Sequence, residues 1–262
     1  MDAVNGVLLV GCGRMGGAMA RGWAASQKVY VYDPQAGDIP GATRVDELSP
    51  EGLPMPLTVV VAVKPQVLGE VLPQIAPFAR AGCLIVSVVA GATLAQFAAT
   101  LGADARVIRT MPNTPAAIGR GITAAVAAPA VTAADRARAD ELLGALGRTL
   151  WLADEGQMDA VTAVSGSGPA YFFRFTEALA RAGEACGLDP ATAMALARAT
   201  FTGAAGLAEH RDEPLDALRV EVTSPGGTTA AALAEFDRDG AIDALVEQAA
   251  RAATARSREL SA

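Results

Sequence analysis

Short runs of β-branched residues alternate with helical patterns along the first part of the chain, up to about residue 152. Between the first two runs, apolar residues from Met15 to Trp23 recur at spacings of three and four, which is typical of a helix packed on a sheet. The alternation predicts βαβ units and a mainly parallel sheet. The predicted strands are Val7 to Val10, Val29 to Tyr32, Thr58 to Val63, Cys83 to Val89, Arg106 to Arg109, Ile122 to Ala127 and Thr149 to Leu152.

After Asp154 the β-branched runs stop, and the remaining pattern is helical and rich in alanine. We therefore predict two domains, an α/β domain over residues 1–154 and an all-helical domain over residues 155–262. Because alanine brings little side-chain bulk for a separate core, we expect the helices to pack against a second copy in a homodimer. The helices are broken at Gly166 to Pro169, Gly187 to Pro190, Asp212 to Pro214 and Ser224 to Gly227.

One uncharged stretch, from Ala81 to Ala103, is long enough to raise the question of a membrane span. Gly91 divides it into a β-branched run and an alanine-rich helical run, so strand, turn and helix are the better interpretation. The segment Met1 to Asn5 offers no basic region and predicts no signal peptide. We expect the protein to work in the cytoplasm.

Charge and residue usage narrow the possible chemistry. A formal net charge of −7 without a Lys/Arg cluster argues against nucleic acid as a partner. Three cysteines far apart, with no CxxC pair, suit a reducing compartment. The chain has one histidine, His210, and its last lysine is Lys64. No metal site built on histidines, no Ser-His-Asp triad and no lysine acid or base after Lys64 is therefore expected.

A glycine-rich turn, Gly11-Cys12-Gly13-Arg14-Met15-Gly16, follows the first predicted strand and opens a helix. In this setting a GxGxxG pattern predicts a dinucleotide site, although the pattern alone is weak. Gly11 would make the tight turn, Gly13 would let the backbone approach the pyrophosphate, and Gly16 would allow close packing of helix on strand. The free N–H groups of the helix start would face the phosphate charge.

Asp33 ends the second predicted strand, roughly 20 residues after the glycine turn, where an acidic residue accepts hydrogen bonds from the adenosine ribose. A carboxylate there repels the 2′-phosphate of NADP, and the residues that follow supply no arginine before Arg44. The sequence therefore favours NADH. Arg14 keeps NADPH open, because a guanidinium in the turn could bind either the pyrophosphate or a 2′-phosphate.

Two further predicted strands run into polar loops at the edge where open α/β sheets bind ligands. The first loop contains Ala62-Val63-Lys64-Pro65, and the second contains Met111-Pro112-Asn113-Thr114-Pro115. Pro65 suits a helix start, and the two prolines of the second loop would present Asn113 as a hydrogen-bonding group. A surface lysine and a merely rigid turn account for the same residues equally well.

Two polar turns stand out among the alanines of the second domain. Val164 to Tyr171 is a glycine and serine turn that opens a helix. In Ser224-Pro225-Gly226-Gly227-Thr228-Thr229, backbone N–H groups and two hydroxyls would converge at the start of a helix from Ala230 to Phe236. Such a turn can hold a carboxylate without a cationic side chain. Ordinary capping by Thr228 is the alternative.

These segments, in this order and spacing, resemble the pyrroline-5-carboxylate reductase family over nearly the whole chain. The resemblance implies a Rossmann-type dinucleotide-binding domain followed by an all-helical dimerisation domain, often assembled further into a decamer. It also implies reduction of 1-pyrroline-5-carboxylate to L-proline by NAD(P)H, the last step of proline biosynthesis. Two residues depart from the family pattern, Arg14 and Asp33, and both concern the choice of cofactor and not the reaction.

The resemblance also implies roles for single residues. The substrate carboxylate would rest on the backbone of the Ser224, Gly226, Gly227 and Thr228 turn, and Thr229 would hydrogen-bond the ring nitrogen. The nicotinamide would lie near Lys64-Pro65 and Met111 to Asn113. A protonated cyclic imine is already an electrophile, so positioning can supply much of the rate without a strong acid.

Two other functions remain alternatives at this point. A 3-hydroxy-acid dehydrogenase of similar architecture needs a base, and a lysine would be expected on the helix after Gly168, where Arg174 lies. Arginine stays protonated and cannot act as that base. A dinucleotide-binding regulator without chemistry would keep the glycine turn and Asp33 but would not need the turn at Thr228-Thr229.

Overall fold

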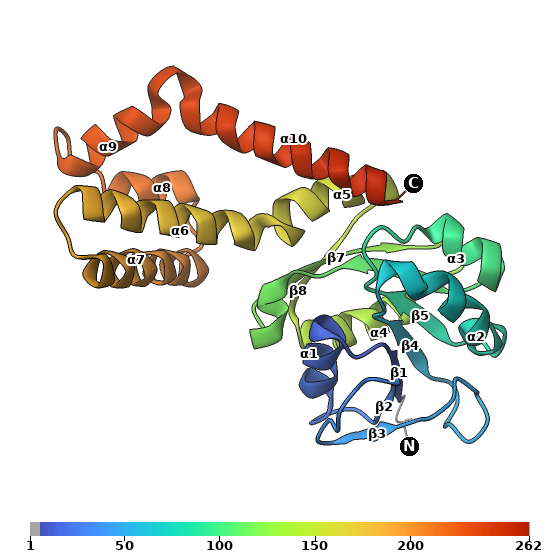
Figure 1. Ribbon diagram of the computed structural model, residues 1–262. Coiled ribbons are helices and arrows are strands. Elements are labelled where there is room, and N and C mark those ends of the chain that lie inside the picture. The colour runs from blue at the N-terminus through green and yellow to red at the C-terminus, as the bar shows by residue number, and fades with distance from the viewer. Residues whose placement is uncertain (1–5, 262) are drawn as a thin grey trace. The chain divides into compact units, whose positions relative to one another are not determined.

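The computed structural model describes residues 6–261 and contains an eight-stranded sheet (Figure 1). Its strand order is β3-β2-β1-β4-β5-β6-β7-β8, and the first six strands have the order of the Rossmann fold. The strands are β1 Val7–Val10, β2 Val29–Tyr32, β3 Ala42–Arg44, β4 Thr58–Val61, β5 Leu84–Ser87, β6 Val107–Met111, β7 Gly121–Ala127 and β8 Gly147–Trp151. The predicted α/β class is confirmed.

The sheet departs from the sequence prediction in two places. Strand β3 was not predicted, because Ala42–Arg44 has no β-branched run and its side chains are exposed or half-buried. It pairs in parallel with β2. Strand β7 runs antiparallel to β6, while the neighbouring pairs are parallel. The sheet is therefore mixed at this end, as "mainly parallel" allows.

Helices cover both faces of the sheet. On one face, α1 (Arg14–Trp23) and α4 (Ala133–Gly144) bury apolar side chains against the strands, and the indole nitrogen of Trp23 donates to the carbonyl of Leu142 at 2.8 Å. On the other face lie α2 (Leu68–Arg80) and α3 (Leu94–Leu101), with Ile75, Phe78 and Phe97 fully buried. The two hydrophobic cores, one on each face of the sheet, hold the carboxyl ends of the parallel strands in fixed register.

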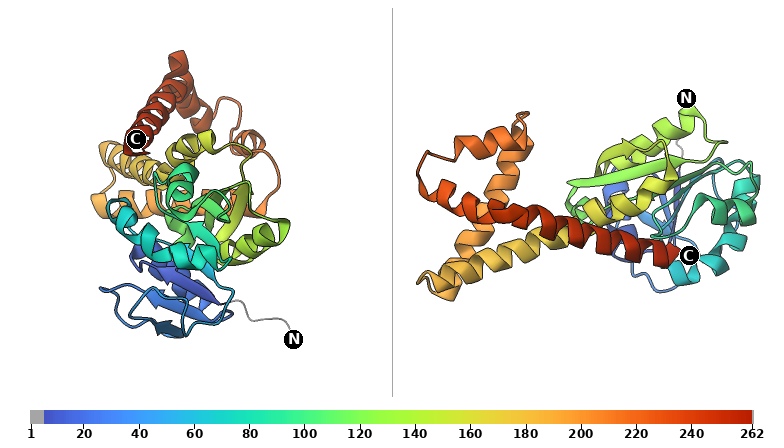
Figure 2. Two further views of the ribbon diagram at one scale, coloured as in Figure 1. Left: turned by 90° about the vertical axis from the view of Figure 1, so that its right-hand side faces the viewer. Right: turned by 90° about the horizontal axis from the view of Figure 1, so that it is seen from above.

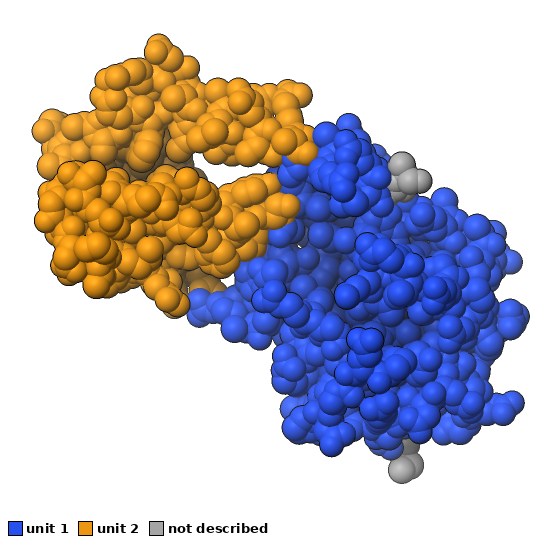
Figure 3. Space-filling model, viewed as in Figure 1, with its two compact units in different colours: residues 1–166, 253–262 blue, residues 167–252 orange. Residues whose placement is uncertain are grey.

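The chain divides into two compact units (Figure 3). Unit 1 consists of residues 1–166 and 253–262, and unit 2 of residues 167–252. The boundary predicted at 154/155 stays a prediction. The short elements of unit 1 are the 3₁₀ turns η1 Pro65–Val67, η2 Thr114–Ile118 and η3 Glu155–Gln157, helix α5 Met158–Val161 and a π-helical turn at Thr162–Gly166.

Unit 2 is helical, as predicted. Its helices are α6 Gly168–Ala185, α7 Pro190–His210, α8 Leu215–Glu221, α9 Thr228–Asp237 and the first part of α10, with a 3₁₀ turn at Arg238–Gly240. The unbroken helix α10, Ala241–Ser261, belongs to both units (Figure 2). Its last turns are joined to α5 inside unit 1, where the hydroxyl of Ser257 donates to Asp159 at 2.7 Å.

Unit 2 buries few and mostly small side chains. Its buried apolar residues among those the structure describes are Ala180, Ala193 and Ala197. Large apolar side chains stay exposed instead, among them Phe172, Phe173, Phe175, Leu196, Leu207, Val220 and Leu245. Exposed apolar area of this kind marks an interaction surface, in agreement with the expectation of a partner for these helices.

Within residues 6–261, no helix is both long enough and apolar enough to cross a membrane. The stretch from Ala81 to Ala103 contains strand β5 and helix α3, as its glycines predict. The segment Met1 to Asn5, on which the prediction about a signal peptide depends, lies outside the described residues.

Candidate functional site

The glycine turn follows β1 and lies between the carboxyl ends of β2 and β4, the two strands on either side of β1. Gly11 has a φ of +93°, and its N–H donates to the carbonyl of Tyr32 at the end of β2. A Cβ on Gly11 would lie 2.8 Å from the carbonyl of Ala62, which follows β4. Only glycine fits at this position, because both the positive φ and the close approach exclude a side chain.

The start of α1 is built for a close approach by another molecule. A Cβ on Gly16 would clash with the carbonyl oxygen of Gly11, so the helix packs directly on the turn. A Cβ on Gly13 would meet no atom within 4 Å, so the backbone there faces open space. Gly13 caps the helix without any side-chain hydrogen bond among the described residues. The first turn of α1 thus has no side-chain cap among the described residues, and N–H groups without such a cap can serve an anion.

Asp33 is held rigidly beside the turn. One carboxylate oxygen accepts the N–H of Cys12 at 2.6 Å, and the other accepts the N–H of Gln35 at 2.8 Å. Each carboxylate oxygen has a second lone pair, so both can still accept from a ribose hydroxyl. The fixed carboxylate is suited to the role predicted for it.

Cys12 occupies the turn between these groups. Burial raises the pKa of its thiol above the usual 9.0, the negative charge of Asp33 raises it further, and Arg21 partly opposes both. The thiol is therefore protonated at neutral pH and leaves the charge of the site unchanged. Arg14, the first residue of α1, is exposed.

The loop after β4 carries the second group of predicted residues. The N–H of Ala62 donates to the carbonyl of Val10, which fixes the loop beside the glycine turn. Lys64 is exposed and precedes the 3₁₀ turn that begins at Pro65. Val63 lies within 2.8 Å of the Cβ position of Gly11. The structure thus brings together Ala62, Val63 and the glycine turn.

Met111 ends β6, and the loop that follows carries Asn113. The side-chain oxygen of Asn113 accepts the N–H of Ile122 at 3.0 Å, which fastens this loop to the start of β7. This hydrogen bond makes the loop rigid, which is one of the two interpretations that the sequence allowed for this segment. The amide nitrogen of Asn113 has no hydrogen bond among the described residues.

The π-helical turn Thr162–Gly166 packs against Met111 at the end of β6. A Cβ on Gly166 would lie 2.9 Å from the methyl group of Met111, so this position has room for glycine alone unless Met111 moves. The hydroxyls of Thr162 and Ser165 donate to carbonyls four residues earlier. Such turns are frequent at functional sites. The sequence predicted a glycine and serine turn here but gave no sign of its contact with Met111.

An ion pair between a buried arginine and a half-buried glutamate supports this region and was not predicted. Arg109 on β6 donates to Glu155 at 2.6 Å, and the same carboxylate oxygen accepts the N–H of Leu94 at the start of α3. The side chain of Arg109 is 9% exposed and that of Glu155 is 28% exposed. The pair joins segments far apart in the sequence, so no local pattern could have indicated it.

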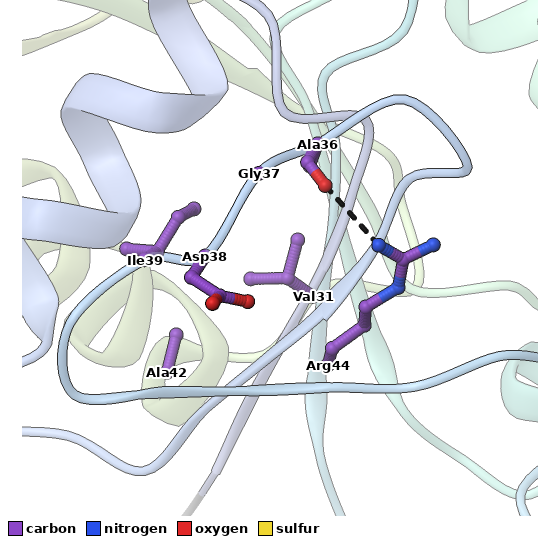
Figure 4. Close-up of a pocket in the computed structure, with 7 residues that line it drawn as sticks. All are labelled: Val31, Ala36, Gly37, Asp38, Ile39, Ala42 and Arg44. Atoms are coloured by element: carbon purple, nitrogen blue, oxygen red, sulfur yellow. Dashed lines mark hydrogen bonds between the residues drawn. The ribbon is translucent and has the colours of Figure 1, made fainter.

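Strand β3 places a second unpredicted residue near Asp33. Arg44 pairs in register with Val31 of β2, and it lines a hollow of about 120 Å³ together with Ala36, Gly37, Asp38, Ile39 and Ala42 (Figure 4). Its guanidinium donates to the carbonyl of Ala36 at 3.2 Å. The position of Arg44 could have been predicted only if Ala42–Arg44 had been recognised as a strand that pairs with β2.

The predicted substrate turn lies in unit 2. The N–H of Gly227 donates to the carbonyl of Ser224 at 3.0 Å, and α9 begins at Thr228. Gly227 caps this helix, and none of the described side chains caps it, so ordinary capping by Thr228 is not what the structure contains. Thr228 is exposed and Thr229 half-buried. The start of α9 thus has no side-chain cap among the described residues.

Among residues 6–261, no group of three or more His, Cys, Asp or Glu side chains is placed so that it could hold a metal ion. Two family models match the chain. Residues 6–91 match F420-dependent NADP oxidoreductases, and residues 155–260 match the pyrroline-5-carboxylate reductase dimerisation domain.

Individual relatives are similar over the whole chain. A pyrroline-5-carboxylate reductase of Pseudomonas aeruginosa is 43% identical, covering 97% of this chain and 96% of that protein. The structure of a pyrroline-5-carboxylate reductase of Coxiella burnetii matches with a TM-score of 0.90 at 30% identity over 99% of both chains. That of a Plasmodium falciparum pyrroline carboxylate reductase, solved with NADP bound, matches with a TM-score of 0.84 at 27% identity over 100% of both. The chain therefore belongs to the pyrroline-5-carboxylate reductase family.

Proposed function

We propose that this protein reduces 1-pyrroline-5-carboxylate to L-proline with NAD(P)H, the last step of proline biosynthesis. The observation that carries the proposal is the family relationship along nearly the whole chain, to a reductase that is 43% identical. Two features support the use of a dinucleotide cofactor: a glycine turn that is open at Gly13 and a fixed carboxylate at Asp33.

The dinucleotide would be held by unit 1. The turn Gly11-Cys12-Gly13-Arg14-Met15-Gly16 would contact the pyrophosphate through backbone N–H groups, and Asp33 would accept hydrogen bonds from the ribose. Ala62, Val63, Lys64, Pro65 and Met111 would complete the binding surface. NAD(P)H, when bound, supplies the hydride that reduces the carbon of the C=N bond.

The substrate would be held by the turn in unit 2. The N–H groups of Gly226, Gly227 and Thr228 would bind its carboxylate, with the hydroxyl of Ser224 beside them. Thr229 would donate a hydrogen bond to the ring nitrogen or receive one from its proton. Asn113 would contribute through its amide nitrogen, since its oxygen is engaged by Ile122.

Positioning is the main contribution of these residues. The imine carbon accepts the hydride and the nitrogen keeps its proton, so the product amine forms without a strong acid. Holding both reactants in one geometry can lower the barrier by several kcal/mol, roughly 7–11 kcal/mol in the best cases. This agrees with Arg174 in place of a basic lysine and with Thr229, whose hydroxyl has no hydrogen bond among the described residues.

For the cofactor we propose a preference for NADH, with NADPH also accepted. The carboxylate of Asp33 would repel a 2′-phosphate, and both its oxygens are fixed in place by the N–H groups of Cys12 and Gln35. A fixed carboxylate cannot turn away from the added negative charge.

We further propose a homodimer formed through the helices of unit 2, able to assemble into a decamer, and a cytoplasmic site of action. The exposed aromatic side chains of α6 support the dimer. The free thiols of Cys12, Cys83 and Cys186 support a reducing compartment.

One assay tests the activity. Loss of reduced-nicotinamide absorbance is followed with 1-pyrroline-5-carboxylate and NAD(P)H, and its gain is followed with a 3-hydroxy acid and NAD(P)+. We expect turnover only with the imine, and at least as high a kcat/KM with NADH as with NADPH. Turnover of the hydroxy acid alone, or of neither substrate, would refute the proposal, and a tenfold preference for NADPH would refute the part assigned to Asp33.

A further inference from the structure

The pairing of β2 with β3 brings a cation next to the ribose end of the proposed cofactor site. Val31 lies opposite Arg44, and the N–H of Val45 donates to the carbonyl of Val31 at 2.9 Å. Asp33 follows two positions after Val31 on β2. Arg44 is therefore a neighbour of Asp33 in space, although the residues directly after Asp33 contain no basic side chain.

The guanidinium of Arg44 is only partly engaged. One nitrogen donates to the carbonyl of Ala36 at 3.2 Å, and another lies 3.7 Å from a carboxylate oxygen of Asp46. The side chain is 53% exposed. A guanidinium has five N–H groups, so most of its donors are available to a ligand.

The bond to Ala36 also fixes where the guanidinium lies. Ala36 belongs to the turn that follows Asp33, and its N–H donates to the carbonyl of Asp33. Figure 4 shows Arg44 reaching back to this turn at the rim of the hollow, while Asp38 lies on the opposite side. The cation is thus held at the turn that borders the ribose-binding carboxylate.

We propose that Arg44 binds the 2′-phosphate of NADPH and so allows a site that carries Asp33 to use both cofactors. The inference rests on the proposed function and names the residue that sets its cofactor selectivity. A guanidinium matches the geometry of a phosphate and can donate two parallel hydrogen bonds to it. Its charge offsets the repulsion between Asp33 and the phosphate, whereas NADH presents no group for it to bind.

The alternative is that Arg44 only ties the turn in place through Ala36. The two roles differ in what a substitution does to two ligands that differ by one phosphate. A structural role affects AMP and adenosine 2′,5′-bisphosphate equally, since both need the turn. Binding of the 2′-phosphate affects only the bisphosphate.

The experiment measures the affinities of AMP and adenosine 2′,5′-bisphosphate by titration calorimetry, on the full chain and on Arg44→Gln, Arg44→Lys and Arg80→Gln. Arg80→Gln removes the same charge from the exposed end of α2 and is the matched control. For Arg44→Gln we expect the bisphosphate affinity to fall at least tenfold more than that of AMP. Arg44→Lys keeps the charge but loses the two parallel N–H donors of the guanidinium, so its bisphosphate affinity should lie between those of the unmodified chain and Arg44→Gln. Arg80→Gln should leave both affinities unchanged.

Equal losses for the two ligands in Arg44→Gln, or an unchanged bisphosphate affinity, would overturn the inference. If Arg44→Gln does not fold, Arg44→Lys carries the same comparison. Because these are binding measurements without substrate, they decide the role of Arg44 even if the reductase assay fails. If the enzyme is active but substitution of Arg44 does not change the bisphosphate affinity, the proposed reaction is retained and only this inference is rejected.

Discussion

The backbone N–H of Cys12 donates a 2.6 Å hydrogen bond to the carboxylate of Asp33, so the glycine turn and the end of β2 form one rigid unit. The bond is charge-assisted and therefore stronger than a bond between neutral groups. A ligand that contacts either partner is positioned relative to the other. The selectivity proposed for Asp33 would thus depend on the same contact that shapes the turn.

Replacing Asp33 by serine should shift the choice of cofactor. Removing the carboxylate takes away a ribose acceptor and the repulsion toward a 2′-phosphate. A hydrogen bond to a charged group contributes about 1.5–3 kcal/mol, so kcat/KM for NADH should fall roughly tenfold or more, and that for NADPH should fall less or rise. Steady-state kinetics with both cofactors measure this, and Asp104→Ser on an exposed turn is the control. Equal losses for both cofactors would mean that Asp33 only supports the turn.

The thiol of Cys12 should report on occupancy of the turn. Because burial and Asp33 raise its pKa above 9.0, little of it is thiolate at pH 7.5, and only the thiolate is nucleophilic. In a Cys186→Ser background, where Cys83 stays buried, alkylation by iodoacetamide should be slow and should keep accelerating above pH 9. NADH should slow it, and Asp33→Ser should speed it up at pH 8. A rate that levels off below pH 9 would contradict the direction of the shift.

Thr229→Ala should lower kcat at least tenfold and leave NADH affinity nearly unchanged. The hydroxyl is proposed to contact the ring nitrogen only, and the loss of such a contact corresponds to about 1.4 kcal/mol or more. Thr229→Ser should restore activity. The matched control is Thr223→Ala, whose hydroxyl donates to the carbonyl of Arg219. An equal loss of turnover and cofactor binding in Thr229→Ala would instead indicate damaged folding.

Gly166→Ala should impair catalysis more than stability. The added Cβ would meet the methyl group of Met111, which is the end of a flexible side chain and can move at a cost of about 1 kcal/mol. The displaced Met111 then disturbs the surface proposed for the nicotinamide, so kcat should fall while the urea midpoint changes little. Gly69→Ala in α2, where a Cβ has open space, should affect neither. Met111→Ala combined with Gly166→Ala should be no less active than Met111→Ala alone, and a further loss would show that Met111 is not the group displaced.

The pair Arg109 and Glu155 should be strongly coupled in stability. Glu155→Ala leaves a buried cation unpaired and should cost about 3 kcal/mol of unfolding free energy. Arg109→Met should cost less, because Glu155 is more exposed and keeps the N–H of Leu94. A double-mutant cycle from urea unfolding should give less loss in the double variant than the sum of the two. Glu235→Ala, which breaks an exposed pair with Arg238, serves as control. Additive losses would show that the ion pair contributes nothing.

The sequence predicted those features that local patterns determine. Runs such as Val7–Val10 and Val29–Tyr32 mark strands. The glycine turn is recognisable because its glycines stand where the turn and the packing of the helix exclude a side chain. Strand β3 was missed because Ala42–Arg44 pairs without burying an apolar run. The antiparallel direction of β7 depends on how the loop around Asn113 folds back onto Ile122.

The unpredicted parts of the site depend on contacts between distant segments. Arg44 contacts the turn after Asp33 only because β3 lies beside β2, and Gly166 meets Met111 only after the sheet and the π-helical turn have formed. Residue types at these positions carry no signal of their own. Arg44 looks like any surface arginine, and Gly166 like any residue of a flexible turn.

The division of α10 between the two units has a mechanical consequence. Strand β1 and the last turns of α10 both belong to unit 1, so unit 2 is an insertion whose two ends leave and re-enter the same unit. Tension applied between β1 and those last turns would load unit 1 first. The helices of residues 167–252 would bear little force until the last turns of α10 lose their contacts in unit 1, among them those of Ser257 and Arg258 with Asp159. Stretching a single molecule should therefore extend the sheet unit or release this helix end before any helix of the insertion unravels.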